Sequence, residues 1–474
     1  MGIDIRSFYV YRWRYQIGYG IIGLFLIGML VFAGLYVPGG ISNNEMNDVI
    51  KSANISLGNI NSYAVTNLPF HLLQRASMHL FGVNDFSIKL PSLILAALSA
   101  VGLVLLLQRW FKRNIAVLGS IIAITTGQFL FIAQSGTPDI LYIFWPICLL
   151  LIGTLIARRT RPRTLWKILF FIVVSLSLYT PLSIYALIAL ATAVLLHPHL
   201  RFIIRQLSRV RLLAGFIIGA LVLIPLIYGI VKSPGTALTI LGLPTHWPNF
   251  AANMPILWQQ YLGFARPSTT LLMTPVFGLG SMLIIGFGVY RLLKTMASTQ
   301  SYIILIWLVC LVPIVITSPL FTSVTFVPFV LLLCTGLDRL LSNWYGIFPR
   351  NPYARFVGLI PLVILVGALV FSGLERYSYG YHYDPATVSN FSYDLSIMPK
   401  NTKQLVVAPN QLQFYNVVAK YNKQLDVVLA PTDNVFTTTH DAKGDYAGYS
   451  INRIITSAMT NDADRFYLYK KTAQ

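Results

Sequence analysis

Residues 89–113 read KLPSLILAALSAVGLVLLLQRWFKR and contain two signals that recur along the chain. The apolar run up to Leu107 is long enough to cross a bilayer, which needs about 20 helical residues. A cationic cluster of Arg109, Lys112 and Arg113 follows directly. An apolar run that ends in Lys and Arg is typical of a transmembrane helix that ends in the cytoplasm.

Composition places the whole chain in the membrane class. Of its 474 residues, 56% are hydrophobic and 11% are charged, whereas soluble domains have about 25% charged residues. A net charge of +20 raises the question of a nucleic-acid partner. The basic residues, however, lie in short clusters between apolar runs, and not on one soluble face. We therefore expect a membrane protein that binds no nucleic acid.

The apolar runs predict a polytopic α-helical membrane protein with about eleven transmembrane helices. Their approximate bounds are 17–37, 89–107, 115–133, 138–157, 169–179, 181–196, 212–231, 271–290, 303–316, 323–341 and 356–374. With eleven crossings, all the Lys and Arg clusters fall on one side, which the positive-inside rule makes the cytoplasm. We therefore expect a multi-pass protein of the plasma membrane, with a cytoplasmic N-terminus and an external C-terminal domain.

Two of these runs are short and meet at Thr180-Pro181. Proline starts a helix well but breaks one when it lies inside. Two interpretations stay open. The runs form a hairpin that does not cross the full apolar thickness of about 30 Å and lines a cavity, or they are joined by a tight external turn.

Residues 1–375 form the predicted transmembrane domain, which has two long external loops. The first loop, 38–88, contains two helices that we expect at the membrane interface. The second loop, 232–270, contains no acidic residue and is rich in aromatic residues and prolines. Aromatic residues at this level are typical of the interface belt, and they would also suit a sugar or polyprenyl ligand.

Composition changes from residue 376 onward, where charges of both signs appear and apolar runs shorten to strand length. We predict strands at 404–408, 425–430 and 467–469, with a helix at 412–420. Alternating strands and helices indicate a small external α/β domain over 376–474.

Acidic residues are few, so the candidates for acid–base chemistry form a short list. Of 15 acids, four fall on the external face of the membrane domain: Glu45, Asp48, Asp85 and Asp139. Glu45 follows Ser42 at the spacing of a capping box, in which both side chains bind backbone N–H groups. A catalytic role and this structural role both stay open for Glu45. Asp48 lies one turn further along the same predicted helix.

Asp139 follows Thr137-Pro138, and these three residues form a good helix start, which alone would explain the aspartate. A carboxylate at the mouth of a spanning helix is also costly and often functional, so both interpretations stay open. Asp85 lies in a predicted turn, and we interpret it as structural.

Cationic side chains of the two loops are candidates for binding a phosphate. His71, Arg75 and His79 are four residues apart and share one face of a predicted helix at 70–80. This face could bind lipid phosphates generally or one specific phosphate. In the second loop, Lys232 and Arg266 are the Lys and Arg residues. The histidine spacing lacks a further ligand nearby, so we expect no metal site there.

Three short motifs resemble the GT-C glycosyltransferases, and more narrowly their branch of protein O-mannosyltransferases and aminoarabinose transferases. Residues 67–71, NLPFH, and 80–92, LFGVNDFSIKLPS, resemble the first loop and second span of that branch, where the pattern is roughly N-x-P-P and then L-F-G-x-x-x-F-x-x-R-L-P-S. Residues 136–140, GTPDI, resemble its R-P-D-A segment. Glu45 occupies the position of its acidic D-E motif. Family-like organisation covers about 1–375.

The sequence departs from the branch at three positions. Asn44 stands where the motif has its aspartate, Thr137 stands where it has an arginine, and Phe70 replaces a proline. Either Glu45 or Asp48 then takes the catalytic role, or the chain is inactive.

The resemblance implies an inverting glycosyltransferase at the external membrane face. It would move a hexose or pentose from a polyprenyl-phosphate donor to a hydroxyl or amine of a protein, lipid or glycan of the cell envelope. Glu45 is the predicted base, and Asp48 and Asp139 complete the catalytic set. The predicted substrate-binding residues are Asn44, Asn67, His71, Arg75, Lys232 and Arg266. No cofactor is expected, and a divalent metal is possible but not indicated.

Other function classes stay open. A transporter or lipid flippase would need ionisable residues near the membrane midplane, whereas the acids here gather at one face. A catalytically inactive scaffold is compatible with Asn44. A polysaccharide polymerase or ligase fits the first-loop motifs less well.

Overall fold

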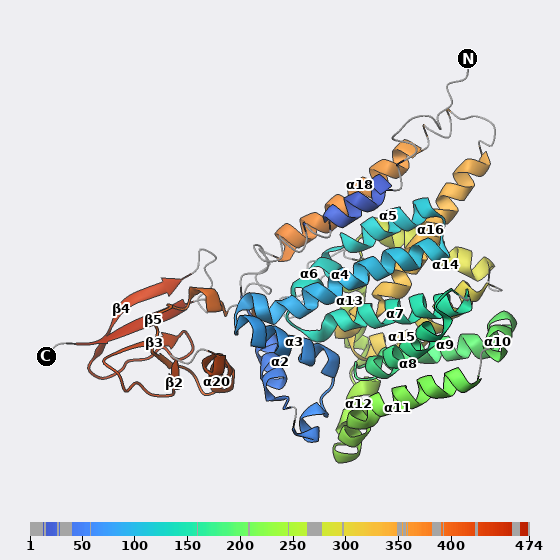
Figure 1. The fold of residues 1–474 in the computed structure, drawn as a ribbon. Coiled ribbons are helices and arrows are strands. Elements are labelled where there is room, and N and C mark those ends of the chain that lie inside the picture. The colour runs from blue at the N-terminus through green and yellow to red at the C-terminus, as the bar shows by residue number, and fades with distance from the viewer. Residues whose placement is uncertain are drawn as a thin grey trace.

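The structure is a computed structural model with a helical bundle and a small sheet (Figure 1). It describes residues 13, 16–25, 28, 40–56, 58–158, 160–206, 209–244, 246–262, 277–295, 298–347, 353, 357, 359–381, 390–391, 393–421, 425–456 and 465–472.

The helices of the bundle follow the predicted apolar runs closely. After a first helix at Gln16–Phe25, they are α2 (Asn43–Asn54), η2 (Ile60–Tyr63), α3 (Leu68–Phe81), α4 (Asp85–Trp110), α5 (Arg113–Ile124), α6 (Gly127–Gln134), η3 (Pro138–Ile140), α7 (Leu141–Ala157), α8 (Arg163–Ser177), α9 (Ser183–Leu196), α10 (Pro198–Arg205), α11 (Arg209–Lys232), α12 (Gly235–Leu241), α13 (Phe250–Leu262), α14 (Leu279–Lys294), α15 (Thr299–Thr317), η4 (Pro319–Thr325), α16 (Phe326–Ile347), α18 (Leu359–Glu375) and η5 (Arg376–Tyr381).

The chain is a multi-pass membrane protein. Among the described residues, 6 helices are long and apolar enough to span a bilayer, or up to 8 if each of two bent pairs counts as one span. Parts of three predicted spans, 17–37, 271–290 and 356–374, lie outside the described residues. The number of eleven spans, and the orientation that depends on it, therefore stay predictions.

Two predicted spans contain breaks. The break at Thr180-Pro181 is confirmed, because α8 ends at Ser177 and α9 begins at Ser183. The run 115–133 is also broken, which the sequence analysis did not expect, and α5 meets α6 at 59°. There Thr125 Oγ1 donates to the Ile121 carbonyl (2.9 Å). Such back-bonding competes with the regular helix.

A mixed sheet of five strands lies at the C-terminus, and we call described residues 393–472 the C-terminal unit. Its elements are β1 (Gln404–Val406), α20 (Leu412–Tyr421), β2 (Asp426–Val428), β3 (Val435–Thr439), β4 (Tyr449–Thr456) and β5 (Arg465–Lys471). The strand order is β2-β1-β3-β5-β4, with β1 parallel to both neighbours and β5 antiparallel to both of its own. The three predicted strands and the helix are confirmed, whereas β3 and β4 were missed. The boundary at residue 376 stays a prediction.

The first-loop helices α2 and α3 lie at the end of the bundle that faces the sheet (Figure 1). Their apolar residues form one buried cluster with residues of the C-terminal unit, such as Val49 with Phe414. A separate and larger cluster fills the bundle. The acidic helix α2 thus lies where the two parts of the molecule meet.

Candidate active site

A capping box begins α2, as predicted. The Ser42 N–H donates to Glu45 Oε2 (2.7 Å), and the Glu45 N–H donates to Ser42 Oγ (3.2 Å). These bonds satisfy backbone donors that the start of a helix leaves without intrahelical partners. The structural role considered for Glu45 is therefore confirmed.

Glu45 also makes a contact far along the chain. The Gly136 N–H donates to its second oxygen, Oε1, and the side chain is 0% exposed. Both carboxylate oxygens thus accept backbone hydrogen bonds. Glu45 joins α2 to the segment that leads to Asp139, and to act as a base it would have to give up one of these bonds.

Both backbone groups of Gly136, its N–H and its carbonyl, form hydrogen bonds. Gln74 Nε2 donates to the Gly136 carbonyl and to the Ile88 carbonyl (both 3.1 Å), while its Oε1 accepts from Ser52 Oγ (2.6 Å). A Cβ at position 136 would lie 2.8 Å from Ile88 Cγ2 and 3.0 Å from Glu45 Oε1. Only glycine fits this space, so residues 135–139, which we call the 136 segment, can approach α2 and α4 this closely only with glycine at position 136.

Asp48 is the second acidic residue of α2, and it differs from Glu45 in its contacts. Its Oδ1 accepts from Lys51 Nζ (3.0 Å), and its Oδ2 has no hydrogen-bond partner among the described residues. Burial raises the pKa of Asp48 to about 6; the Lys51 charge opposes this shift, and the charges of Asp139 and Glu45 add to it. A carboxylate that titrates near neutral pH is suited to accept a proton.

Asp139 lies in η3, directly before the spanning helix α7. Its Oδ2 accepts from Thr137 Oγ1 (2.9 Å), and Thr137 Oγ1 also pairs with Ser135 Oγ (2.8 Å). Asp139 lies three residues after Gly136, which bonds Glu45, and Asp48 lies one turn after Glu45 on α2; the Asp139 charge adds to the raised pKa of Asp48. The structure therefore brings all three predicted catalytic residues to one place at the end of the bundle.

The three residues of the predicted cationic face of α3 lie in three different environments. His71 is 1% exposed, and its Nδ1 lies 2.9 Å from Ser52 Oγ on α2. Burial lowers the pKa of His71 to about 4, so the ring is neutral at pH 7. His79 packs edge-on against Tyr421 of the C-terminal unit, and Arg75 is half-buried. Of the three, Arg75 is suited to bind a phosphate directly.

The other predicted binding residues lie in different environments. Asn44 is exposed beside Glu45. Asn67 precedes α3 with φ 57°, and its N–H donates to the Tyr179 carbonyl (2.8 Å), which ties the first loop to the broken helix pair. Lys232, at the end of α11, donates to Asn61 Oδ1 (3.1 Å). Arg266 lies outside the described residues.

A buried cation at the end of α18 was missed. Arg376 follows α18, and its Nη1 is buried without a hydrogen-bond partner among the described residues. Its neighbour Tyr377 donates through its hydroxyl to Gln134 Oε1, and Gln134 lies two residues before Gly136. The signal in the sequence is an arginine at the predicted external end of a span, where the positive-inside rule expects few.

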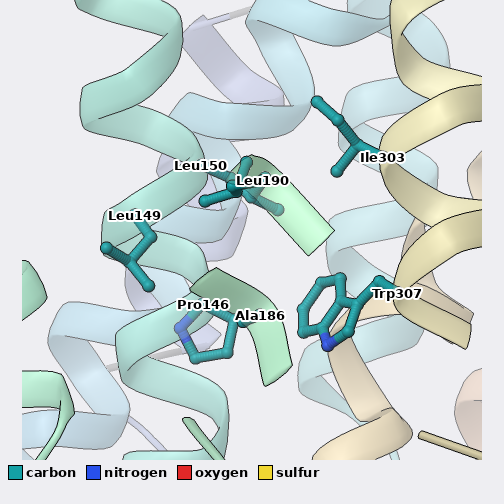
Figure 2. A pocket seen from close by; sticks show the side chains of 7 residues that line it. All are labelled: Pro146, Leu149, Leu150, Ala186, Leu190, Ile303 and Trp307. Atoms are coloured by element: carbon teal, nitrogen blue, oxygen red, sulfur yellow. The ribbon is translucent and has the colours of Figure 1, made fainter. Parts of the chain in front are cut away.

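A narrow cavity lies between α7, α9 and α15 (Figure 2). Seven apolar residues line it: Pro146, Leu149, Leu150, Ala186, Leu190, Ile303 and Trp307. Its volume of about 10 Å³ has room for a single water-sized sphere. A space of this size and lining carries no chemistry. Within the described ranges, no group of three or more His, Cys, Asp or Glu side chains is placed to hold a metal ion.

Comparisons with known proteins agree with this fold. Residues 68–228 match the model of the dolichyl-phosphate-mannose-protein mannosyltransferase family. The structure resembles ArnT from Cupriavidus metallidurans bound to undecaprenyl phosphate, with 11% identity and a TM-score of 0.52 over 95% of this chain and 97% of that one. The apo state of the same protein gives 12% and 0.53 over 96% and 98%. No curated protein sequence matches.

A second fold relative is the archaeal oligosaccharyltransferase AglB from Archaeoglobus fulgidus in complex with an inhibitory peptide and a dolichol-phosphate. It is 14% identical, with a TM-score of 0.53, over 88% of this chain and 65% of that chain. The predicted resemblance is confirmed: the chain has a GT-C fold and is similar to the aminoarabinose transferase and protein mannosyltransferase branch.

Proposed function

We propose that this chain is an inverting glycosyltransferase that moves a sugar from a polyprenyl-phosphate donor to an acceptor hydroxyl or amine at the external face of the membrane. One observation carries the proposal: Glu45, Asp48 and Asp139 lie at the same end of the bundle. The GT-C fold supports it, since relatives of that fold are described as bound to undecaprenyl phosphate or dolichol-phosphate.

The three carboxylates have different roles in this proposal. Glu45 was the predicted base, and that role stays a prediction, because both of its oxygens already bind backbone N–H groups. Asp48 fits the role of base better. It has an oxygen without a partner among the described residues, and its pKa of about 6 leaves it mostly ionised at pH 7. Asp139 then orients the acceptor or the donor sugar beside it.

The reaction is a single displacement. Asp48 removes the proton from the acceptor O–H or N–H as the acceptor atom bonds to the anomeric carbon. The bond from that carbon to the phosphate oxygen breaks on the opposite face, and the lipid phosphate leaves with the electron pair. Arg376, whose buried Nη1 lacks a partner in the described part of the chain, is the cation we assign to this phosphate, with Arg75 as a second. Lys232 and Arg266 remain candidates from the sequence.

A catalytically inactive scaffold is the second candidate function. The observation that favours it is Asn44 in place of the expected aspartate, together with the full occupancy of the Glu45 oxygens. A flippase is less well supported, because the carboxylates gather at one end of the bundle.

The test is transfer of radiolabelled sugar from a panel of polyprenyl-phosphate donors by membranes that contain the full chain. We expect transfer from at least one donor and none from membranes that lack the chain. The Asp48→Asn/Asp139→Asn double variant should abolish it, whereas Asp433→Asn, at an exposed acid of the C-terminal unit, should not. Absence of transfer from every donor would favour the scaffold.

A further inference from the structure

The helix that carries the carboxylates is buried along one broad face, whose two adjoining parts have different neighbours. Glu45 bonds Gly136, and Ser52 bonds Gln74 of α3. Met46 and Val49, with exposed fractions of 6% and 0%, belong instead to the apolar cluster shared with the C-terminal unit. Phe414, Val417 and Val418 of α20 supply that unit's side of the cluster.

The backbone that enters α2 pairs directly with the C-terminal unit. The Ile41 N–H donates to the Tyr393 carbonyl (2.6 Å), and the Tyr393 N–H donates to the Ile41 carbonyl (3.3 Å). A Cβ at Gly40 would lie 2.8 Å from the Phe391 carbonyl oxygen and 2.9 Å from that of Tyr393. The close approach of these two segments therefore requires glycine at position 40.

Side chains at the start of α4 strengthen the same junction. Lys89 is 5% exposed; its Nζ donates to the Gly40 carbonyl (2.7 Å) and lies 5.7 Å from the centre of the Phe391 ring. Asp85 Oδ1 accepts from the Leu395 N–H (3.4 Å). The junction thus combines apolar burial with hydrogen bonds from backbone and side chains.

We propose that the C-terminal unit is a positioning part of the active site, which holds α2 so that Asp48 faces Asp139. The proposal rests on the proposed function, because it takes Asp48 as the catalytic base. An isolated helix of 12 residues is marginal in water, so α2 depends on what packs against it. The bundle packs against one part of its buried face, and the C-terminal unit packs against the adjoining part. The unit would then govern the rate of the chemical step, whereas a unit that only recognises the acceptor would govern acceptor affinity.

The test uses Gly40→Ala in the full chain, reconstituted in lipid nanodiscs. The added Cβ should displace the Tyr393 segment without touching a carboxylate. Gly444→Ala is the matched control, because a Cβ there meets nothing within 4 Å. We expect the amides of α2 to exchange hydrogen about tenfold faster in Gly40→Ala and at the wild-type rate in the control. Unchanged exchange in Gly40→Ala would overturn the proposal.

Kinetics supply the second readout. Gly40→Ala should lower kcat by about tenfold or more and leave the KM for acceptor within about twofold. A raised acceptor KM with unchanged kcat would overturn the positioning role in favour of acceptor recognition. Lys89→Met adds no bulk and removes the hydrogen bond to Gly40, so it should act in the same direction if Gly40→Ala fails to fold. If wild type transfers no sugar, the proposed function fails, and the exchange data still decide whether the unit holds α2.

Discussion

The two long loops, 38–88 and 232–270, differ in how their helices are buried. In the first loop, one broad face of α2 is buried against the bundle and the C-terminal unit, and Glu45 and Val49 are each 0% exposed. In the second loop, α13 has a narrower buried face, and of its described side chains only Leu257 and Gln260 are buried. Phe250, Met254 and Trp258, spaced four apart, have exposed fractions of 44%, 53% and 63%.

The difference shows which loop is built to hold groups in place. Asn253 on the covered face of α13 donates to the Ile316 carbonyl (2.9 Å), and Tyr261 pairs with Thr325 (2.9 Å), so the helix is anchored to the bundle. Its exposed aromatic face suits the membrane interface. A reaction that needs fixed carboxylates belongs in the first loop, whereas the second loop suits contact with lipid.

Among changes that test this difference between the two loops, Gly136→Ala in the first loop should have the largest effect on transfer. The new Cβ would lie 2.8 Å from Ile88 Cγ2, and overpacking of this kind costs about 1–3 kcal/mol. Asp139, three residues on, would move, so transfer should fall on the order of 100-fold. Thermal unfolding and transfer rates measure the two effects. Gly58→Ala, which meets no atom within 4 Å, should change neither. A wild-type transfer rate in Gly136→Ala would contradict the claim that transfer requires the first loop to hold its carboxylates in place.

An intermediate effect is expected on the pH dependence of transfer. A base works when it is deprotonated, so the rate should rise with pH through about 6 and then level off. Lys51 lowers the pKa of Asp48, and Lys51→Met should therefore move the midpoint to higher pH. Lys400→Met, at an exposed lysine of the C-terminal unit, is the control. A midpoint that Lys51→Met leaves in place would argue against Asp48 as the titrating group.

The smallest effect is expected on the open face of α13. Trp258→Ala should change stability by less than about 0.5 kcal/mol, as surface changes usually do. Leu257→Ala, at a residue that is 9% exposed, should cost about 2–5 kcal/mol. Unfolding of both variants in the same detergent tests the pair. Equal losses would mean that the exposed face of α13 is covered in the native protein.

Local patterns predicted much of this molecule. The apolar runs gave most bundle helices, and Ser42 with Glu45 gave the capping box, because both features depend on neighbours in the sequence. The rarity of acids led to Glu45, Asp48 and Asp139. The break at Thr125 was missed because threonine back-bonding leaves no composition signal.

Contacts between distant segments could not be predicted. Glu45 and Gly136 are 91 residues apart, so nothing near either residue shows that both Glu45 oxygens are occupied. Arg376 was assigned to the tail, because the burial of its side chain depends on how α18 packs. Strand β4 was missed since nearly all of its residues are exposed, which removes the alternating pattern.

The most direct test of the account compares Asp48→Asn with Glu45→Gln in the same transfer and unfolding assays. We expect Asp48→Asn to reduce the transfer rate by about 10²–10⁴-fold, the usual contribution of a general base, with little loss of stability. Glu45→Gln should retain more activity and lose about 1–3 kcal/mol of stability, because a buried N–H loses its acceptor. The reverse result, with transfer abolished in Glu45→Gln at wild-type stability and retained in Asp48→Asn, would contradict the assignment of Asp48 as the base and Glu45 as the residue that holds the site together.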